Sequence, residues 1–189
     1  YQEVNLILEL SVAENICLGR QSTVGGLIRW GAIRRRAQQA LARLGLDIDV
    51  TATLSSYSIA IQQMVAIARA LDVQARLLIL DEPTSSLDEQ EVAELFAVLR
   101  RLRDDGLGIV FITHFLDQVY AISDRITVLR NGKLVGTYEA AGLPKLSLIA
   151  HMIGKDPAEV EAMSQAPPPP APTGAEAFLR AEQLGRAGS

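Results

Sequence analysis

The sequence predicts an α/β fold in which a parallel sheet forms the core and a helical segment precedes it. Four consecutive aliphatic residues at 77–80 indicate a strand that is buried on both faces, as in a parallel sheet. A second apolar run at 109–113 indicates a neighbouring strand. Between these runs, residues 89–103 have the spacing of a long amphipathic helix.

Composition fits a globular domain and excludes several classes of protein. With 189 residues and 49% hydrophobic content, the chain can bury one sizeable core. Its net charge of −4 gives no support for nucleic-acid binding, and Arg34–Arg36 is interpreted as a solvated helix face. The single Cys17 excludes an internal disulfide framework. No apolar run reaches the roughly 18 residues of a membrane span, so membrane association is expected through a partner.

Helical spacing dominates the part of the chain before the first strand. A mixed apolar pattern over residues 9–18 and a clearer one over 31–44 predict two helices, and Gly45 follows where a C′ glycine is expected. Ser58 is the expected N-cap of a third helix.

Acidic residues and a histidine follow the two predicted strands. Asp81 and Glu82 end the first strand, and His114 ends the second, which places all three at one sheet edge, where ligands bind in open α/β sheets. A carboxylate there can hold Mg²⁺, and its neighbour can polarise a water for attack on a phosphoryl group. The alternative is an acidic strand end that only begins a turn. Asp88 is also suited to cap the next helix, with Glu91 completing a capping box.

The last third of the chain contains a hairpin, a helix and a proline-rich stretch. Residues 126–129 and 133–138 flank Asn131-Gly132, a pair that favours a type I′ turn. Residues 146–153 predict a short helix, and prolines at 167–172 indicate an extended linker.

Taken in order, these motifs resemble those of the ABC-transporter ATPases. Residues 77–88 resemble the Walker B segment and D-loop, 1–3 the Q-loop, 57–64 the signature motif, and 112–114 the switch-histidine loop. The resemblance extends to about Asp156. Its details are most similar to the tandem ATPase subunits of bacterial sugar importers of the ribose, xylose and galactose type, through residues 10–16, 62–65 and 152–156.

The sequence of the signature motif differs from the one usual in the family. Ser58 and Ala60 fit a sugar-importer variant, whereas Tyr57 and Ile61 do not, and Ile61 cannot form the side-chain hydrogen bonds of the usual Gln. An alternative register over residues 54–56 would place the following helix too far downstream, so the register beginning at Tyr57 is preferred.

The resemblance implies a role for each candidate site residue. Bound ATP and Mg²⁺ are expected, with the metal held by Asp81 and Gln2, the hydrolytic water handled by Glu82, and the γ-phosphate contacted by His114. Further nucleotide contacts are expected from Gln2, Ser58, Ala60 and Asp88. The alternative for Asp88 is the helix cap alone.

The sequence contains no G-x-x-x-x-G-K-[S/T] phosphate-binding loop. We therefore expect an incomplete P-loop NTPase domain that lacks the Walker A part, as a fragment of a tandem protein. The expected divisions are a partial ABC ATPase domain over 1–156, with a helical subdomain at about 8–70 and the rest of the catalytic core at 71–156, then a Pro-rich linker over 157–176, and the start of a second ATPase domain over 177–189.

The function implied by the resemblance is that of the ATP-binding and ATP-hydrolysing component of a carbohydrate importer, peripheral on the cytoplasmic face of the membrane. Expected partners are a second ATPase half, transmembrane permease subunits and, indirectly, a periplasmic sugar-binding protein, with no nucleic acid. One alternative is a catalytically impaired half that supports the dimer without productive hydrolysis. Another is a cytosolic ABC protein without a membrane partner.

Overall fold

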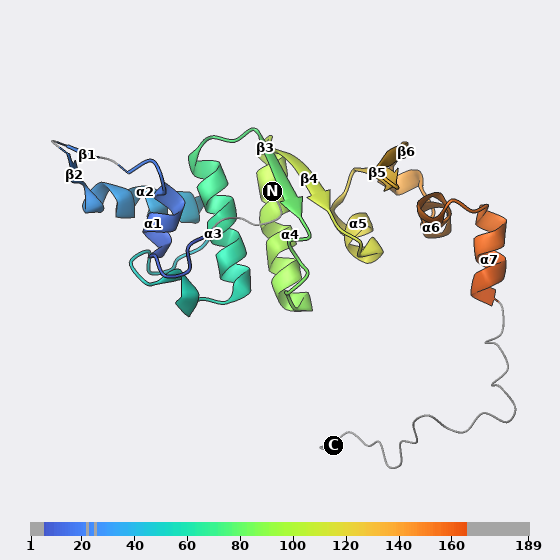
Figure 1. Ribbon diagram of the computed structural model, residues 1–189, viewed down its shortest axis with the longest axis horizontal. Helices are drawn as coiled ribbons and strands as arrows, with labels where there is room; N and C mark the ends of the chain where they lie inside the picture. The colour runs from blue at the N-terminus through green and yellow to red at the C-terminus, as the bar shows by residue number, and fades with distance from the viewer. Residues whose placement is uncertain (1–5, 22, 25, 166–189) are drawn as a thin grey trace, which may run out of the picture. The chain divides into compact units, whose positions relative to one another are not determined.

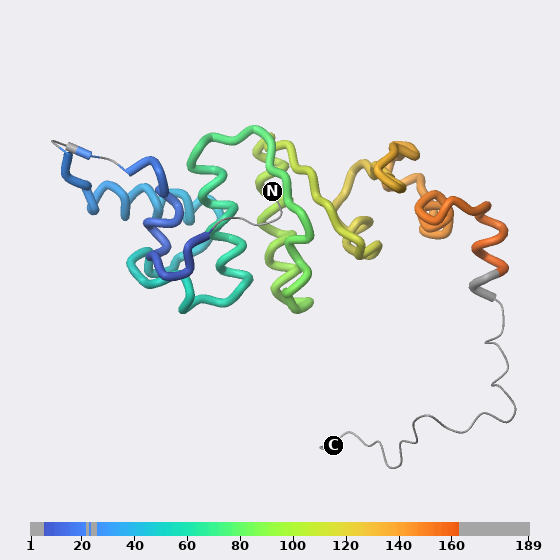
Figure 2. Tube along the Cα trace, viewed as in Figure 1, coloured from blue at the N-terminus to red at the C-terminus, as the bar shows by residue number. Residues whose placement is uncertain are grey.

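The computed structural model describes residues 6–165 apart from Ser22 and Gly25 (Figure 1), and the other residues are grey in the trace of Figure 2. Gln2, the proline-rich stretch and the expected start of a second ATPase domain lie outside the described residues. The chain divides into two compact units. The first comprises Tyr1–Ile126 and Thr137–Gly142, and the second comprises Thr127–Gly136 and Leu143–Ser189.

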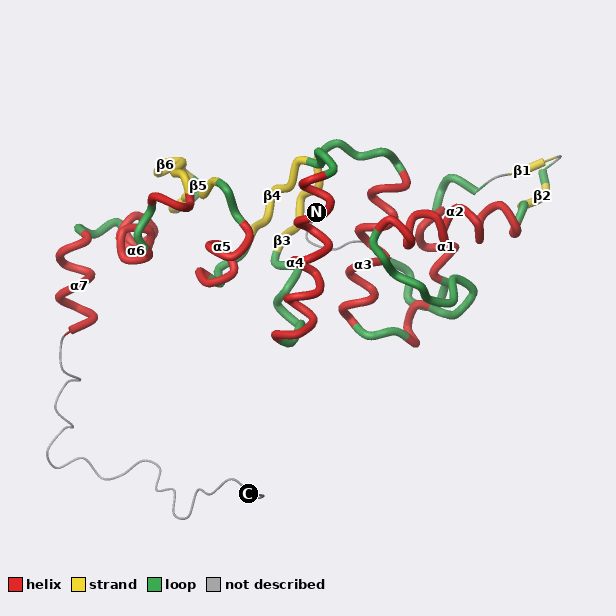
Figure 3. The backbone as a smooth tube through the Cα atoms, turned by 180° about the vertical axis from the view of Figure 1, so that it is seen from behind, coloured by secondary structure: helices red, strands yellow, loops and turns green. Residues whose placement is uncertain are grey.

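The first unit begins with a helical part in which three helices pack against one another (Figures 1 and 3). Its elements are α1 (Val12–Cys17), β1 (Thr23–Val24), β2 (Leu27–Ile28), α2 (Trp30–Arg43), η1 (Leu54–Ser56) and α3 (Ile59–Asp72). The antiparallel β1–β2 hairpin was not predicted, because each of its strands has only two residues and provides no periodicity.

The first helix is shorter than residues 9–18, the predicted range, because polar groups fix both its start and the turn before it. Ser11 caps α1 and forms a capping box with Glu14. The fully buried Asn15 accepts a hydrogen bond from the Ile7 amide at 2.8 Å and donates to the Ile7 carbonyl at 2.9 Å. These bonds hold the chain before Ser11 in a turn, so the helix cannot begin at Glu9.

The ends of α2 and α3 confirm the predicted caps. Gly45 has a φ of +73°, the left-handed conformation expected at C′. A Cβ at this position would approach the guanidinium of Arg101 to 3.1 Å, and the same guanidinium donates a hydrogen bond to the Leu44 carbonyl at 3.0 Å. Ser58 caps α3 by accepting from the Ile61 amide at 3.4 Å.

A nearly buried carboxylate at the end of α3 links the three helices. Asp72 has a side chain that is only 6% exposed, and it contacts Arg20 Nη1 at 2.6 Å and Arg36 Nε at 2.5 Å. The neighbouring Cys17 is fully buried. Its burial, followed by the negative charge of Asp72, raises the pKa of the Cys17 thiol.

The sheet of the first unit is a parallel pair, β3 (Leu77–Asp81) and β4 (Gly108–Ile112), in a register that runs from Leu77↔Gly108 to Asp81↔Ile112. Figures 1 and 3, seen from opposite sides, show α4 (Glu89–Asp104) on one face of this pair. Leu78 and Leu80 are buried on that side, and Phe96 of α4 packs edge-to-face on Phe111 at 5.7 Å.

The other face of the pair corrects the prediction of strands buried on both sides. Leu77 and Ile79 are 54% and 56% exposed, and Val110 and Ile112 are 43% and 46% exposed. Alternate residues are therefore buried in β3 and partly buried in β4, because α4 covers one face and the described residues supply no layer over the other. The unbroken apolar run could not reveal this, because its sequence is the same whether one face or both are covered.

The remaining elements are α5 (Leu116–Ile122), β5 (Arg125–Arg130), β6 (Lys133–Glu139), η2 (Ala140–Gly142), α6 (Lys145–Ile153) and α7 (Pro157–Gln165). The predicted hairpin is confirmed, since Asn131 and Gly132 both have positive φ, as a type I′ turn requires. No helix in the described part of the chain is long and apolar enough to cross a membrane.

Helix α7 occupies residues 157–165, which we expected to belong to the linker. Its first residue is a proline, which is well suited to the first helical position. Asp156 precedes it and accepts a hydrogen bond from the Ala158 amide at 2.9 Å. The proline content of the whole stretch concealed this helix start.

We expect Asp72→Ala to lower the free energy of unfolding by about 1–3 kcal/mol, because it leaves two arginines without their shared acceptor. The value lies below that of a fully buried pair because Arg20 and Arg36 are 28% and 38% exposed. Urea unfolding followed by circular dichroism measures it. Asp47→Ala removes an exposed carboxylate as the matched control, and an equal effect of the two changes would contradict the proposed role of Asp72.

Candidate functional site

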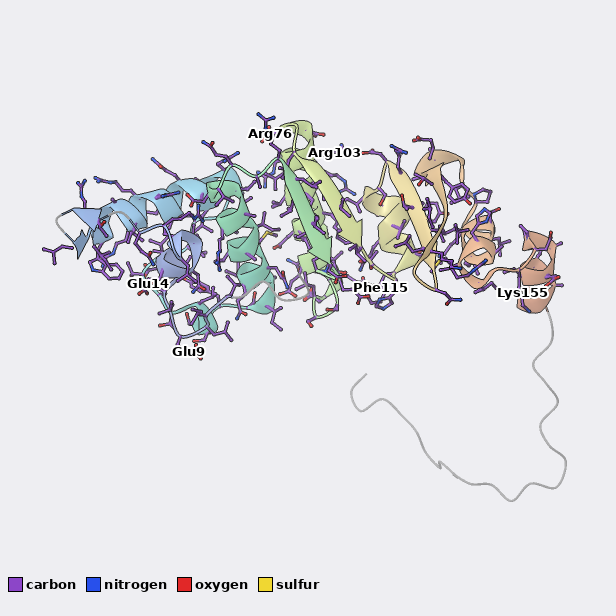
Figure 4. The ribbon with its side chains drawn as sticks, turned by 45° about the horizontal axis from the view of Figure 1, so that its top comes forward. Glu9, Glu14, Arg76, Arg103, Phe115 and Lys155 are labelled. Carbon is purple, nitrogen blue, oxygen red and sulfur yellow. The ribbon has the colours of Figure 1, made fainter. Side chains whose placement is uncertain are left out.

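The candidate site lies at the carboxyl ends of β3 and β4. The parallel register places Asp81 opposite Ile112. One residue later, the Glu82 amide donates to the Ile112 carbonyl at 2.9 Å, so the pairing continues past the strand end. Figure 4 shows Phe115 at this end of the strands and Arg76 at the opposite end. Both chain segments therefore leave the sheet at the same edge, as predicted.

The two predicted catalytic residues contact each other at this edge. His114 Nδ1 lies 2.8 Å from Glu82 Oε1, and the side chains are 60% and 44% exposed. With a proton on Nδ1, His114 donates to the carboxylate, and its Nε2 remains available to a ligand. The imidazole also lies against the Phe115 ring, at 4.1 Å between centroids. The pair is open to solvent and can reach a bound molecule.

The backbone conformation of Glu82 helps to place its carboxylate. Its φ is +46°, a left-handed value that is uncommon for residues other than glycine. The chain turns sharply here, and the Ser85 amide donates to the Glu82 carbonyl at 3.2 Å. Such strained positions are concentrated at functional sites. The turn directs the chain away from the strand, so that the Glu82 side chain meets His114.

Asp81 is the candidate metal ligand, and it is half-buried at the last position of β3. It follows Leu77 and Ile79 at alternate positions and so belongs to the open face of the sheet. Within the described residues, no group of three or more His, Cys, Asp or Glu side chains could hold a metal ion. Mg²⁺ commonly takes one or two carboxylates and completes its shell with phosphate oxygens and water. Gln2, the other expected ligand, lies outside the described residues.

A second contact between the two strand-end segments was not predicted. Thr84 is only 3% exposed, and its hydroxyl donates to Gln118 Oε1 at 2.6 Å. Thr84 follows Glu82 by two residues, and Gln118 follows His114 by four. No spacing in the sequence pairs these residues, since they are 34 positions apart. Their shared strand edge was the available signal, and our prediction for that edge considered only charged residues and histidine.

The other predicted nucleotide contacts lie at helix starts. Asp88 is the N-cap of α4 and accepts from the Glu91 amide at 2.8 Å, which confirms the predicted capping box. Ser58 caps α3, and Ala60 is 8% exposed in its first turn. The recorded hydrogen bonds of Ser58 and Asp88 are with their own helices, whereas those of Glu82 and His114 join two segments. The structure thus brings together only part of the predicted set.

The signature segment has one further contact that was not predicted. Gln62 Nε2 donates to the Tyr57 carbonyl at 2.9 Å, so the side chain spans the segment that enters α3. Ile61 packs against the hydrophobic core together with Tyr57. An apolar residue at position 61 therefore has a structural role here.

Comparison with known proteins supports this interpretation of the motifs. A model of the family described as "ABC transporter" matches residues 1–85. The galactofuranose transporter ATP-binding protein YtfR of Escherichia coli is 51% identical over 156 residues, which is 82% of this chain and 31% of that protein. The ribose import ATP-binding protein RbsA 1 of Rubrobacter xylanophilus is 44% identical over 189 residues, which is all of this chain and 36% of that protein. The chain thus spans about a third of the length of these relatives.

Solved structures agree on the fold. A dimeric ATP-binding cassette, MJ0796, in a post-hydrolysis state with ADP and Pi, has a TM-score of 0.60 and 28% identity, and the match covers 76% of this chain and 62% of that one. An inward-facing putative metal-chelate type ABC transporter has a TM-score of 0.68 and 25% identity, with 81% and 62% covered.

The family model matches the part of the chain that includes the predicted signature and Walker B segments. The relatives named for sugar transport extend the match across at least four fifths of the chain. The fold is that of ABC ATPase domains, and His114 joins Glu82 at the sheet edge where the motifs predicted it. Residues 1–85 thus match the ABC transporter family, and the relatives that extend this match along the chain are ATP-binding proteins of sugar importers.

Proposed function

We propose that this chain forms part of the ATP-binding and ATP-hydrolysing component of a carbohydrate importer. The observation that carries the proposal is the 2.8 Å contact between Glu82 and His114, directly beside Asp81, at the carboxyl edge of a parallel strand pair. Relatives named for galactofuranose and ribose support a sugar as the transported molecule. The three residues supply the groups that phosphoryl transfer to water requires after the phosphates are held.

Each residue has a distinct task in this proposal. Glu82 orients the attacking water and accepts its proton, while His114 contacts the γ-phosphate with the ring nitrogen that Glu82 leaves free. Asp81, with Gln2, would hold Mg²⁺, and the bound ion would supply positive charge to neutralise the phosphates. Glu82 and His114 are exposed to solvent, so both can reach a nucleotide whose phosphates are held by another part of the protein.

The helix starts serve the nucleotide of a second ATPase half. The amide groups at the start of α3, around Ser58 and Ala60, favour an anionic phosphate, since they form the positive end of the helix dipole. Asp88 contacts the second ATPase half at the interface where this nucleotide binds. Permease subunits and, through them, a periplasmic sugar-binding protein complete the assembly at the cytoplasmic face of the membrane.

A regulatory half that does not hydrolyse ATP is the second candidate. It is favoured by Ile61, which is apolar and packs on the core where the family usually has a glutamine. The contact between Glu82 and His114 opposes it, because a half without chemistry has no need for two polar side chains held together at the sheet edge. The two candidates differ in the expected consequence of neutralising Glu82.

We expect Glu82→Gln to reduce ATP hydrolysis by roughly 10²-fold or more while ATP binding is retained, since the amide preserves shape but cannot accept a proton. The assay uses a longer protein that carries these residues together with a phosphate-binding loop, with any second hydrolytic site disabled. Phosphate release and nucleotide binding are measured separately.

Glu89→Gln is the matched control, because it makes the same chemical change at an exposed position in the first turn of α4. It should leave hydrolysis within about twofold, since an isolated surface change has little effect. If Glu82→Gln also leaves the rate unaltered, the regulatory half replaces the hydrolytic one.

We also expect Thr84 and Gln118 to be energetically coupled. Gln118→Leu leaves the buried Thr84 hydroxyl without its acceptor and should destabilise this chain by about 1–3 kcal/mol, whereas Gln118→Glu keeps an acceptor and should be milder. A cycle with Thr84→Val, measured by urea unfolding, should give a coupling of about 0.5–1.5 kcal/mol. Strict additivity of the two changes would show that the contact does not join the segments.

A further inference from the structure

The segment from the end of α1 to just beyond α2 carries an unbalanced positive charge. Residues 15–46 contain six arginines and no Asp or Glu, although the whole chain has a net charge of −4. Two of these arginines, Arg20 and Arg36, are paired with Asp72. The segment therefore keeps an excess of positive charge after its ion pairs are counted.

Three of the remaining arginines are close in sequence at the start of α2. Arg29 precedes the helix, and Arg34 and Arg35 follow within its first six residues. All three are exposed, and the ion pairs found among the described residues do not include them. Arg34 is near enough to Asp49 to contribute to the lowered pKa of that carboxyl, after the hydrogen bonds from Thr51. These side chains are free to meet an anionic surface.

Large apolar side chains are exposed at the same place. Leu27 is 77% exposed, Ile28 44% and Trp30 46%. Trp30 and Arg34 are one helical turn apart, while Ile33 is buried against the core. We call this set the Trp30 patch, and it comprises Leu27, Ile28, Arg29, Trp30, Arg34 and Arg35. Arg35 lies about 100° around the helix from Arg34 and so extends the positive charge to the neighbouring side.

The location of the patch suits contact with a broad surface. In Figures 1 and 3 the β1–β2 hairpin extends beyond the start of α2, on the side away from α3 and the β3–β4 pair. Isolated exposed hydrophobic residues are ordinary in soluble proteins. Three exposed apolar residues close to three arginines without an ion pair among the described residues are less ordinary. The arginines suit the anionic headgroups of a membrane, and the apolar side chains suit the acyl chains beneath them.

We propose that the Trp30 patch binds the surface of an anionic lipid bilayer. Arginines near such a surface are attracted to the headgroups, and a tryptophan is favoured at the boundary between headgroups and acyl chains. Leu27 and Ile28 supply the apolar area that electrostatic attraction alone lacks. This goes beyond the proposed function, in which permease subunits alone bring the chain to the membrane.

The observations favour lipid over nucleic acid as the anionic partner. The net charge of −4 opposes any extended polyanion, whether nucleic acid or bilayer, so the apolar side chains of the patch decide between the two. A nucleic acid would gain little from Leu27 and Ile28, whereas a bilayer buries them.

The chain provides its own probe, since Trp30 is its single tryptophan. We expect its fluorescence to shift to shorter wavelength with vesicles of equal phosphatidylcholine and phosphatidylglycerol, and not with phosphatidylcholine alone. Brominated acyl chains should quench it. Binding should weaken at 0.5 M salt, where exposed charges are screened. The assay contains no nucleotide, so its result is independent of the hydrolytic proposal.

The triple variant Arg29→Gln, Arg34→Gln, Arg35→Gln should bind these vesicles at least tenfold more weakly. A matched variant with Arg76→Gln, Arg125→Gln and Lys133→Gln loses the same charge at exposed positions elsewhere and should bind like the original chain. Circular dichroism confirms that both variants are folded.

Three outcomes would overturn the proposal. The first is an unchanged Trp30 spectrum when the chain sediments with anionic vesicles, which would place the contact at another surface, such as the open face of β3–β4. The second is equal weakening by the two triple variants, which would show a dependence on overall charge only. The third is a stronger Trp30 response to single-stranded nucleic acid than to anionic vesicles.

Discussion

The parallel pairing of β3 with β4 is the constraint on which the proposed chemistry depends. Its register places Asp81 opposite Ile112, and the bond from the Glu82 amide to the Ile112 carbonyl extends the pairing by one residue. Both chains then leave the same edge, where Glu82 meets His114 and Thr84 meets Gln118. A shift of one residue would move Asp81 off the face it shares with Ile79 and separate these partners.

The helical part of the first unit is stabilised by a different kind of interaction. There the buried polar groups are few and fully bonded. Asn15 forms hydrogen bonds with the backbone of the turn before α1, and Asp72 at the end of α3 forms ion pairs with Arg20 and Arg36. Arg101 of α4 reaches the Leu44 carbonyl at the end of α2, which connects the helical part to the helix that covers the sheet. The signature segment and the strand edge thus belong to one packed unit.

Sequence patterns were most successful where one local rule decides the conformation. Gly45, Ser58, Asp88 and the Asn131-Gly132 turn all adopt the predicted geometry, because capping and turn preferences act over a few residues. The shared edge of Glu82 and His114 was also predicted, since parallel strands bring their carboxyl ends together. The roles proposed for Ser58, Ala60 and Asp88 toward a nucleotide remain predictions.

Other features depend on tertiary packing and left no comparable pattern. The aliphatic run at residues 77–80 could not show whether one face of the β3–β4 pair is exposed or both faces are covered. The Thr84–Gln118 contact joins residues that are distant in sequence, and the helix α7 begins inside a stretch dominated by proline. The cluster Arg34–Arg36 was predicted to be a solvated helix face. The structure divides that cluster, because Arg36 is bound to Asp72 while Arg34 and Arg35 are exposed.

The most direct test of the central claim is a nuclear Overhauser measurement between the His114 ring and the Glu82 side chain in isotopically labelled chain. The account predicts a cross-peak, since Nδ1 and Oε1 lie 2.8 Å apart. Cross-peaks between Leu80 and Phe111, which are partners in the register, report independently that the sheet has formed. If those peaks are present and the peak between His114 and Glu82 is absent, the strand edge does not assemble the proposed pair, and the account is contradicted.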